Sequence, residues 1–218
     1  MWLGLARRRT LVLPTWKGWL LLVGAVAGCT FLLLRGAYPY LAAESRLPKA
    51  DVVLIEGWVS DDAVAQAKQE LEAGRCDLIC TAGVDLDKGS HLLEWKDWAT
   101  LAAETLKAMG VPEDKILSAP GGAIRRHRTY VGFEKAREKL ATLNKTPIRI
   151  NVITEGPHGR RSITVARKVF GDTATIGVIS VEPISYEPKH WWTTSNGLKG
   201  VFMELVGSTY ERFADSGR

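Results

Sequence analysis

The segment TEGPHGRR concentrates side chains that could carry out chemistry at one point in the chain. His158 is of a residue type that gains and loses a proton near neutral pH, so it is a candidate general acid or base. Glu155 or Glu56 would orient its ring. Arg160 and Arg161 follow, and guanidinium groups bind phosphates and carboxylates through paired hydrogen bonds. The pattern predicts an anion site beside His158, and a loop histidine with only structural hydrogen bonds is the alternative.

The rest of the chain indicates how this segment is positioned. From residue 51 onward, short β-branched runs alternate with longer helical patterns. The expected strands are 51–55, 77–81, 115–119, 149–154 and 175–181. The expected helices are about 60–73, 91–109, 124–142, 160–170 and 195–213. Because continuously apolar strands are typical of parallel sheets covered on both faces, we predict an α/β, Rossmann-like three-layer domain with about five parallel strands.

The carboxyl ends of the predicted strands are the expected place for a ligand. In an open parallel sheet, ligands bind just outside these ends. The ends carry polar residues and glycines, and the candidate ligand-binding positions among them are Glu56, Gly57, Gly83, Thr154 and Gly156. Any α/β domain has loops at this edge, so the glycines alone are also compatible with simple turns.

Five arginines lie where two of the expected helices begin: Arg125, Arg126, Arg128, Arg160 and Arg161. A helix N-terminus carries partial positive charge, so a cation there is unfavourable by up to about 1 kcal/mol. A bound anion would compensate, because helix amides and guanidinium groups together form phosphate and carboxylate sites. The alternative is that some of the arginines form internal ion pairs with Glu56, Glu155 or Asp85.

Several common sites are missing from the sequence. It contains no GxxxxGK[ST] phosphate-binding motif, no GxGxxG after the first strand and no GxSxG. The four histidines lack the spacing of metal ligands, and Cys76 and Cys80, if they lie on a strand, are too far apart for a disulfide. We therefore expect no metal site and no cofactor. A P-loop nucleotidase, a standard dinucleotide oxidoreductase and a serine hydrolase are disfavoured.

The N-terminal part predicts a membrane anchor. Residues 18–34 carry no charge and would span roughly 25 Å as a helix, close to the thickness of a hydrocarbon core. Arg7, Arg8, Arg9 and Lys17 precede this run, and basic residues mark the cytoplasmic side. The predicted parts are a cytoplasmic basic tail, a transmembrane anchor, a linker and an extracytoplasmic Rossmann-like domain, at 1–17, 18–34, 35–48 and 49–218.

Two processing events are alternatives to a retained anchor. Leu41 to Ala43 form a poor cleavage site for a signal peptidase. The segment VAGC, which ends at Cys29, is similar to the lipobox of bacterial lipoproteins, in which the cysteine is lipidated. The apolar run continues to Leu34, whereas lipoproteins usually turn polar after that cysteine. Lipidation of Cys29 stays an alternative to the retained helix.

The net charge of +5 belongs mainly to the N-terminal tail. The chain has 29 lysines and arginines against 24 acidic residues, and removing the four basic residues before position 18 leaves 25 against 24. A nearly neutral domain lacks the basic surface that nucleic-acid binding requires. No nucleic-acid partner is therefore expected.

Several segments together resemble one bacterial family. They are DVVLIEGW, CTAG, GVPEDKIL, RTYVGFEKAR, VITEGPHGRRS and WWTTSNGLKGVFMELVG, within about residues 49–213. Their order resembles the SanA-, ElyC- and YdcF-like envelope proteins, in a branch with a C-terminal pair of tryptophans. The most specific element is a strand with Thr154 followed by His-x-x-Arg at His158 and Arg161. The sequence departs from the wider family at Glu56, where a glycine cluster is usual, and after Thr129, where no asparagine appears four residues later.

The resemblance implies a Rossmann-like domain behind one membrane helix and a part in cell-envelope biogenesis. With the arginines, it leads us to expect a single-pass protein of the bacterial inner membrane with its domain on the periplasmic or extracytoplasmic side. The expected ligand is an anionic, phosphorylated envelope metabolite, such as a lipid-linked sugar carrier, in envelope or peptidoglycan precursor metabolism. The alternatives are a non-catalytic ligand-sensing or scaffold module and a nucleotide-cofactor-binding transferase.

Overall fold

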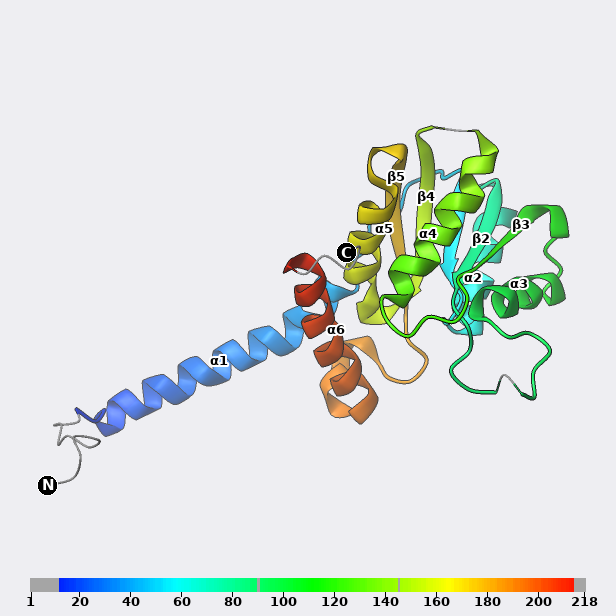
Figure 1. Cartoon of the computed structure of the whole chain (residues 1–218). Helices are drawn as coiled ribbons and strands as arrows, with labels where there is room; N and C mark the ends of the chain where they lie inside the picture. Colours follow the sequence, from blue (N-terminus) through cyan, green and yellow to red (C-terminus); the bar gives the residue numbers. More distant parts are fainter. Residues whose placement is uncertain (1–11, 90, 145, 214–218) are drawn as a thin grey trace, which may run out of the picture. The chain divides into compact units, whose positions relative to one another are not determined.

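The computed structural model describes residues 12–89, 91–144 and 146–213. It divides the chain into two compact units, residues 1–36 and 37–218. Arg7, Arg8 and Arg9 of the predicted basic tail lie outside the described residues. Figure 1 shows the elements of both units in chain order.

The first unit consists mainly of the N-terminal part of helix α1 (Trp16–Leu41). Its most apolar stretch has a mean hydropathy of 2.0, and its side chains are almost all exposed. The helix is thus long and apolar enough to cross a membrane, features that a signal sequence shares. The predicted linker at 35–48 is wrong in its first part, because α1 continues to Leu41. Ala37, Tyr38 and Leu41 are buried within the second unit.

The second unit is built on a five-stranded parallel sheet in the order β3-β2-β1-β4-β5. Its strands are β1 (Val52–Glu56), β2 (Leu78–Gly83), β3 (Ile116–Pro120), β4 (Ile148–Glu155) and β5 (Ala174–Val181). All five residues of β1 are buried, as continuous aliphatic runs in a central parallel strand require. This confirms the predicted α/β, Rossmann-like fold, and each predicted strand lies within two residues of the observed one.

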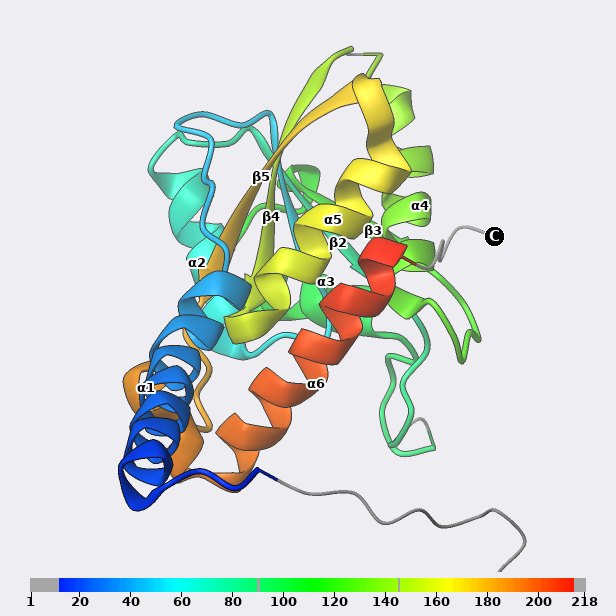
Figure 2. The same ribbon diagram turned by 90° about the vertical axis from the view of Figure 1, so that its left-hand side faces the viewer.

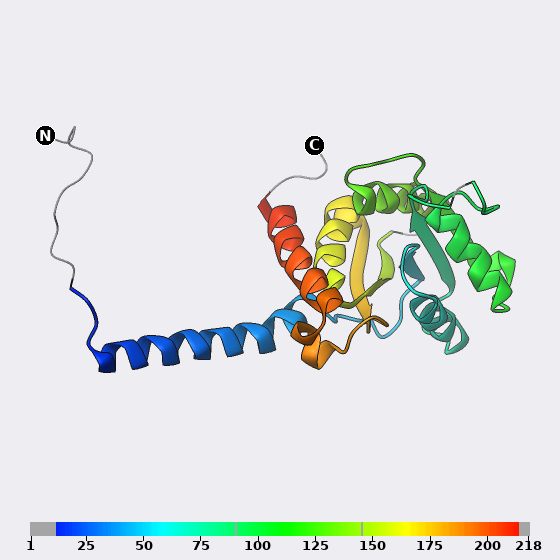
Figure 3. The same cartoon turned by 90° about the horizontal axis from the view of Figure 1, so that it is seen from below.

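Helices cover both faces of the sheet (Figures 1 and 2). They are α2 (Asp61–Glu72), α3 (Trp98–Ala108), α4 (Arg128–Leu140), α5 (Gly159–Phe170) and α6 (Ser195–Phe213). One core joins α4 and α5 to the face that presents Leu54, and the other joins α2 and α3 to the face that presents Val53. Short 3₁₀ turns η1 (Glu113–Lys115), η2 (Ala141–Leu143), η3 (Gly156–His158), η4 (Gly171–Thr173) and η5 (Pro188–Thr193) connect elements. Figure 3 shows α6 on the outer side of α5.

Two predicted helices begin too early. Helix α3, expected from residue 91, begins at Trp98, because Asp97 is extended and its carboxylate caps the amide of Thr100 at 2.7 Å. Helix α4, expected from residue 124, begins at Arg128, because His127 has the left-handed conformation with φ of 54°. A helix cannot continue through such a residue. The arginines before position 127 therefore lie in the preceding loop rather than in α4.

Candidate functional site

The candidate site lies where the strand order of the sheet reverses. From β1 the chain moves outward to β2 and β3, and it then returns to the other side of β1 as β4. The carboxyl ends of β1 and β4 therefore border the crevice in which doubly wound sheets bind ligands. Glu56 is the last residue of β1, and His158 ends the turn η3 that follows β4. The topology thus brings together two side chains 102 positions apart in the sequence.

A buried carboxylate forms the base of the site. Glu56 is only 3 % exposed, and one of its oxygens, Oε2, accepts hydrogen bonds from the hydroxyls of Thr154 and Ser162, the latter at 2.9 Å. Its other oxygen, Oε1, lies 3.3 Å from Nε2 of His158 and has no closer partner among the described residues. The geometry fixes the carboxylate beneath the imidazole ring, as predicted for Glu56.

A second carboxylate holds the opposite side of the ring. Oε1 of Glu204, on α6, lies 2.9 Å from Nδ1 of His158. Arg161 donates two hydrogen bonds to Glu204, from Nε to Oε2 at 2.9 Å and from Nη2 to Oε1 at 2.8 Å. Nη2 also lies 2.9 Å from Nδ1 of His158. A guanidinium and a protonated imidazole both act only as donors, so Nη2 and Nδ1 share no hydrogen bond. The two cations lie close together because both contact Oε1 of Glu204.

These four residues, Glu56, His158, Arg161 and Glu204, form what we call the inner cluster. Burial by itself lowers the pKa of His158, but the charge of Glu56 and the hydrogen bonds to both carboxylates raise it to about 9. Burial raises the pKa of Glu204, but its contacts with His158 and Arg161 lower it to about 2. Burial likewise raises the pKa of Glu56, yet the charge and hydrogen bond of His158 and the two hydroxyl donors bring it below its usual value. At neutral pH the cluster thus holds two positive and two negative charges.

A cavity of about 860 Å³ opens beside the inner cluster. All four members line it, together with parts of α4, α6 and the loop that precedes α4. The Trp58 ring packs edge-on against His158 with centroids 5.1 Å apart, and it is partly exposed at the cavity wall. The volume is in the range that accommodates metabolites and drug-sized molecules.

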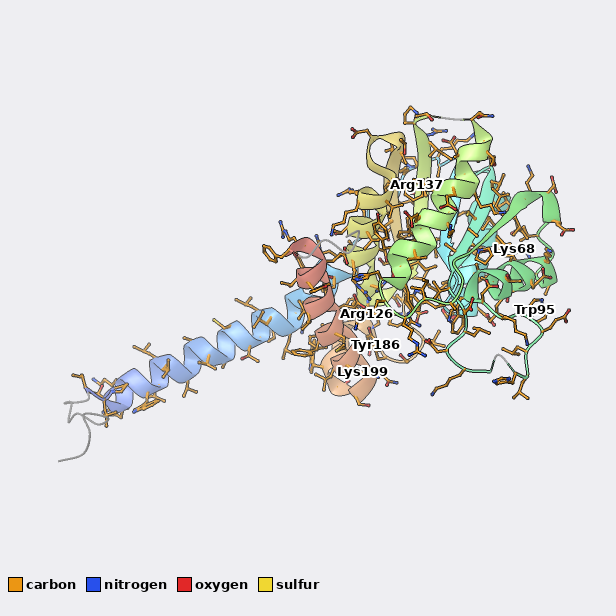
Figure 4. All side chains as sticks on the ribbon, in the orientation of Figure 1. Lys68, Trp95, Arg126, Arg137, Tyr186 and Lys199 are labelled. Carbon is orange, nitrogen blue, oxygen red and sulfur yellow. The ribbon has the colours of Figure 1, made fainter. Side chains whose placement is uncertain are left out.

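Basic residues line the side of the cavity formed by the N-terminal end of α4. We call Arg125, Arg126, His127 and Arg128 the basic rim. Arg128 pairs with Asp87. Arg125 and Arg126 are exposed and form no ion pair or hydrogen bond with any residue that the structure describes. Figure 4 shows Arg126 beside this end of α4. The rim therefore adds two uncompensated positive charges to the neutral inner cluster.

Not all of the predicted site residues meet in this cavity. Glu56, Arg125 and Arg128 line it, whereas Thr154 is buried behind it and donates a hydrogen bond to Glu56. Gly83 lines it as well, but a Cβ there would lie 2.7 Å from Cβ of Trp98, so close packing also requires this glycine. The prediction that Arg125, Arg126 and Arg128 open a helix is correct only for Arg128.

Four other predicted residues have different surroundings. Oε2 of Glu155 accepts the backbone amide of Ser60 at 3.0 Å and contributes nothing to the cavity lining. Arg160 donates to the carbonyl of Tyr40 and stacks over its ring at 3.8 Å. Gly57 allows close approach of the backbone at Trp98, whose carbonyl oxygen would lie 2.3 Å from an added Cβ. Gly156 adopts a φ of 52° in the turn η3, so it serves the turn.

The sequence did not reveal Glu204, although it completes the inner cluster. Its signal was a glutamate inside the apolar run GVFMELVG, a pattern that by itself indicates only a helix. Ser162 was missed as well, because a serine in the first turn of a helix is common. The chain matches no protein-family model, and no curated protein matches it.

Proposed function

We propose that this protein is a membrane-anchored Rossmann-like domain that binds an anionic, phosphorylated metabolite in the cavity between the inner cluster and the basic rim. The proposal places the domain outside the cytoplasm of a bacterial cell, behind a single pass through the inner membrane, with a role in envelope or peptidoglycan precursor metabolism. The resemblance to SanA-, ElyC- and YdcF-like proteins and the apolar helix α1 support that setting.

The observation that carries the proposal is the unpaired charge of the basic rim. Arg125 and Arg126 stand beside the N-terminal end of α4, where the backbone amides of the first turn have no partner within the helix. Cations are unfavourable at that end of a helix. A phosphate group would accept hydrogen bonds from the amides and the guanidinium groups together. Its negative charge would compensate the repulsion between the arginines and the helix N-terminus. Arg161, in contrast, already pairs with Glu204 through two hydrogen bonds, so we assign it a smaller share in binding than the sequence led us to expect.

The inner cluster would act on the ligand as an acid. With a pKa of about 9, His158 carries its second proton at neutral pH, so it can donate a proton and cannot accept one. Glu56 and Glu204 hold the ring from both sides and would stabilise the charge. In this proposal His158 donates its proton to an oxygen atom of a ligand whose phosphate is held by the rim.

One observation favours a second function, a ligand-sensing module without turnover. Each charged member of the inner cluster already has a partner of opposite sign, and Nε2 of His158 is buried. A cluster whose charges are already paired without a ligand can also serve to hold α6 against α5. His158→Gln separates the two functions: a catalytic role predicts loss of complementation in cells with near-normal phosphate affinity. Equal losses of complementation and affinity would favour the module that only binds.

Anion binding itself is tested by thermal unfolding of the full chain in detergent, with inorganic phosphate and with a sugar phosphate. A charge-assisted hydrogen bond contributes about 1.5–3 kcal/mol, so Arg125→Ala and Arg126→Ala should each weaken binding roughly 10- to 150-fold. Arg167→Ala is the matched control, because Arg167 is exposed on α5 and does not line the cavity. If neither anion stabilises the wild type at millimolar concentration, or if Arg167→Ala weakens binding as much, the proposal is wrong.

A further inference from the structure

One side of helix α6 presents an exposed apolar surface. The exposed residues on it, which we call the apolar stripe, are Leu198, Phe202, Met203, Val206, Tyr210 and Phe213. Phe202 is 64 % exposed and Phe213 84 %. A stripe of large apolar side chains along a whole helix usually marks a contact with another molecule or with lipid.

The apolar stripe lies on the side of α6 that faces away from the domain. At 3.6 residues per turn, its members fall within an arc of roughly 140° and extend about 22 Å along the helix axis. The opposite side carries Val201 and Glu211, which are buried, and Glu204 of the inner cluster. The functional cavity and most of the apolar stripe therefore lie on different sides of α6, and Tyr210, near the C-terminal end of the helix, belongs to both.

The point at which the chain enters the domain lies close to the N-terminal half of α6. The second unit begins at Ala37, immediately after the apolar segment that could cross a membrane. The ring of Tyr38 packs edge-on against Tyr186 at 6.3 Å. The hydroxyl of Tyr186 in turn approaches α6 so closely that a Cβ on Gly200 would lie 3.3 Å from it. Figure 4 shows Tyr186 and Lys199 at this end of α6.

We infer that the apolar stripe docks onto the bilayer that α1 crosses, with α6 lying in the interfacial region. Because no long linker follows Ala37, the domain cannot move far from the membrane surface. Tyrosines and lysines such as Tyr186 and Lys199 are typical of that region, where aromatic rings and basic groups meet lipid head groups. The inference goes beyond anion binding, and it requires only that α1 is retained as a membrane span.

Site-specific fluorescence in proteoliposomes tests this docking. Phe202→Cys and Val206→Cys are made in the full chain with Cys29→Ser, labelled with an environment-sensitive fluorophore and reconstituted with anionic phospholipids. The remaining cysteines, Cys76 and Cys80, are buried and should not react. We expect blue-shifted emission at both stripe positions and strong quenching by lipids that carry a nitroxide near the head group.

Two further labels complete the experiment. Lys135→Cys places the label on an exposed position of α4, where we expect no quenching, and Val23→Cys places it deep in the apolar part of α1, where we expect strong quenching by lipids that carry the nitroxide on the acyl chain. Stripe labels quenched no more than the label at position 135 would overturn the inference. Stripe labels that are blue-shifted but insensitive to nitroxide lipids would also overturn it, in favour of a protein contact. An unquenched label at position 23 would remove its basis, and none of these outcomes bears on phosphate binding.

Discussion

At the scale of single residues, His158 is held between two carboxylates, and this arrangement links stability to pH. Its pKa in the folded chain, about 9, lies above the ordinary value of 6.5, so the folded state binds the proton more tightly than the unfolded state. The resulting stabilisation is fully present below pH 6.5 and is lost as the pH rises through 9. The free energy of unfolding of the wild type, relative to His158→Gln, should therefore fall across this interval. Urea denaturation at several pH values measures it, and a constant difference would contradict the assignment.

The pairing of Glu204 gives a second prediction at this scale. Glu204→Gln removes the negative charge that faces both His158 and Arg161, and a buried group left without its partner costs about 1–3 kcal/mol. Arg161→Ala should cost less, because that side chain is a third exposed. The control is Glu138→Gln, whose exposed pair with Lys135 should contribute less than about 1 kcal/mol. Equal effects of Glu204→Gln and Glu138→Gln on unfolding would show that the inner cluster is not structural.

At the scale of elements, the packing of α3 against the ends of β1 and β2 sets the shape of the site. A Cβ on Gly57 would lie 2.3 Å from the carbonyl oxygen of Trp98, so the helix would have to move. We expect Gly57→Ala to lower the free energy of unfolding by about 1–3 kcal/mol. Gly132→Ala is the matched control, because its Cβ would meet only ordinary contacts from 3.6 Å and alanine favours a helix by up to about 1 kcal/mol. Urea denaturation of both variants measures the free energies of unfolding. Equal values would contradict the close contact between Gly57 and the backbone of Trp98.

Elements were predictable from the sequence where a single pattern determines them. The strands are continuous aliphatic runs, such as VVLI at the start of β1, and burial on both faces leaves few alternatives. The starts of α3 and α4 were not predictable, because they depend on the conformation of Asp97 and on the left-handed backbone at His127. The proximity of Glu56 to His158 was predictable, because Glu56 ends β1, His158 follows β4, and the carboxyl ends of parallel strands lie at one edge of the sheet. The contact with Glu204 was not, because it depends on how α6 packs against α5.

At the scale of the whole molecule, the proposed orientation in a membrane rests on α1 and the charges around it. The basic residues lie before the apolar run, so the domain is expected on the far side from the cytoplasm. A reporter that is active only outside the cytoplasm, fused to the C-terminal end of the chain, should be active. Activity of a reporter that works only in the cytoplasm would reject the orientation. Incorporation of labelled fatty acid that is lost in Cys29→Ser would show lipidation instead of a retained helix.

The proposed anion site can be examined on the protein as it leaves the cell. Full-length wild type, the double variant Arg125→Ala/Arg126→Ala and the control Arg167→Ala are purified in parallel, and the small molecules that accompany each are identified by mass spectrometry and phosphorus analysis. The site predicts a phosphorus-containing anion with the wild type and the control, and its loss from the double variant. A wild type without such an anion, or a double variant that keeps it, would contradict the assignment of the basic rim as the binding site.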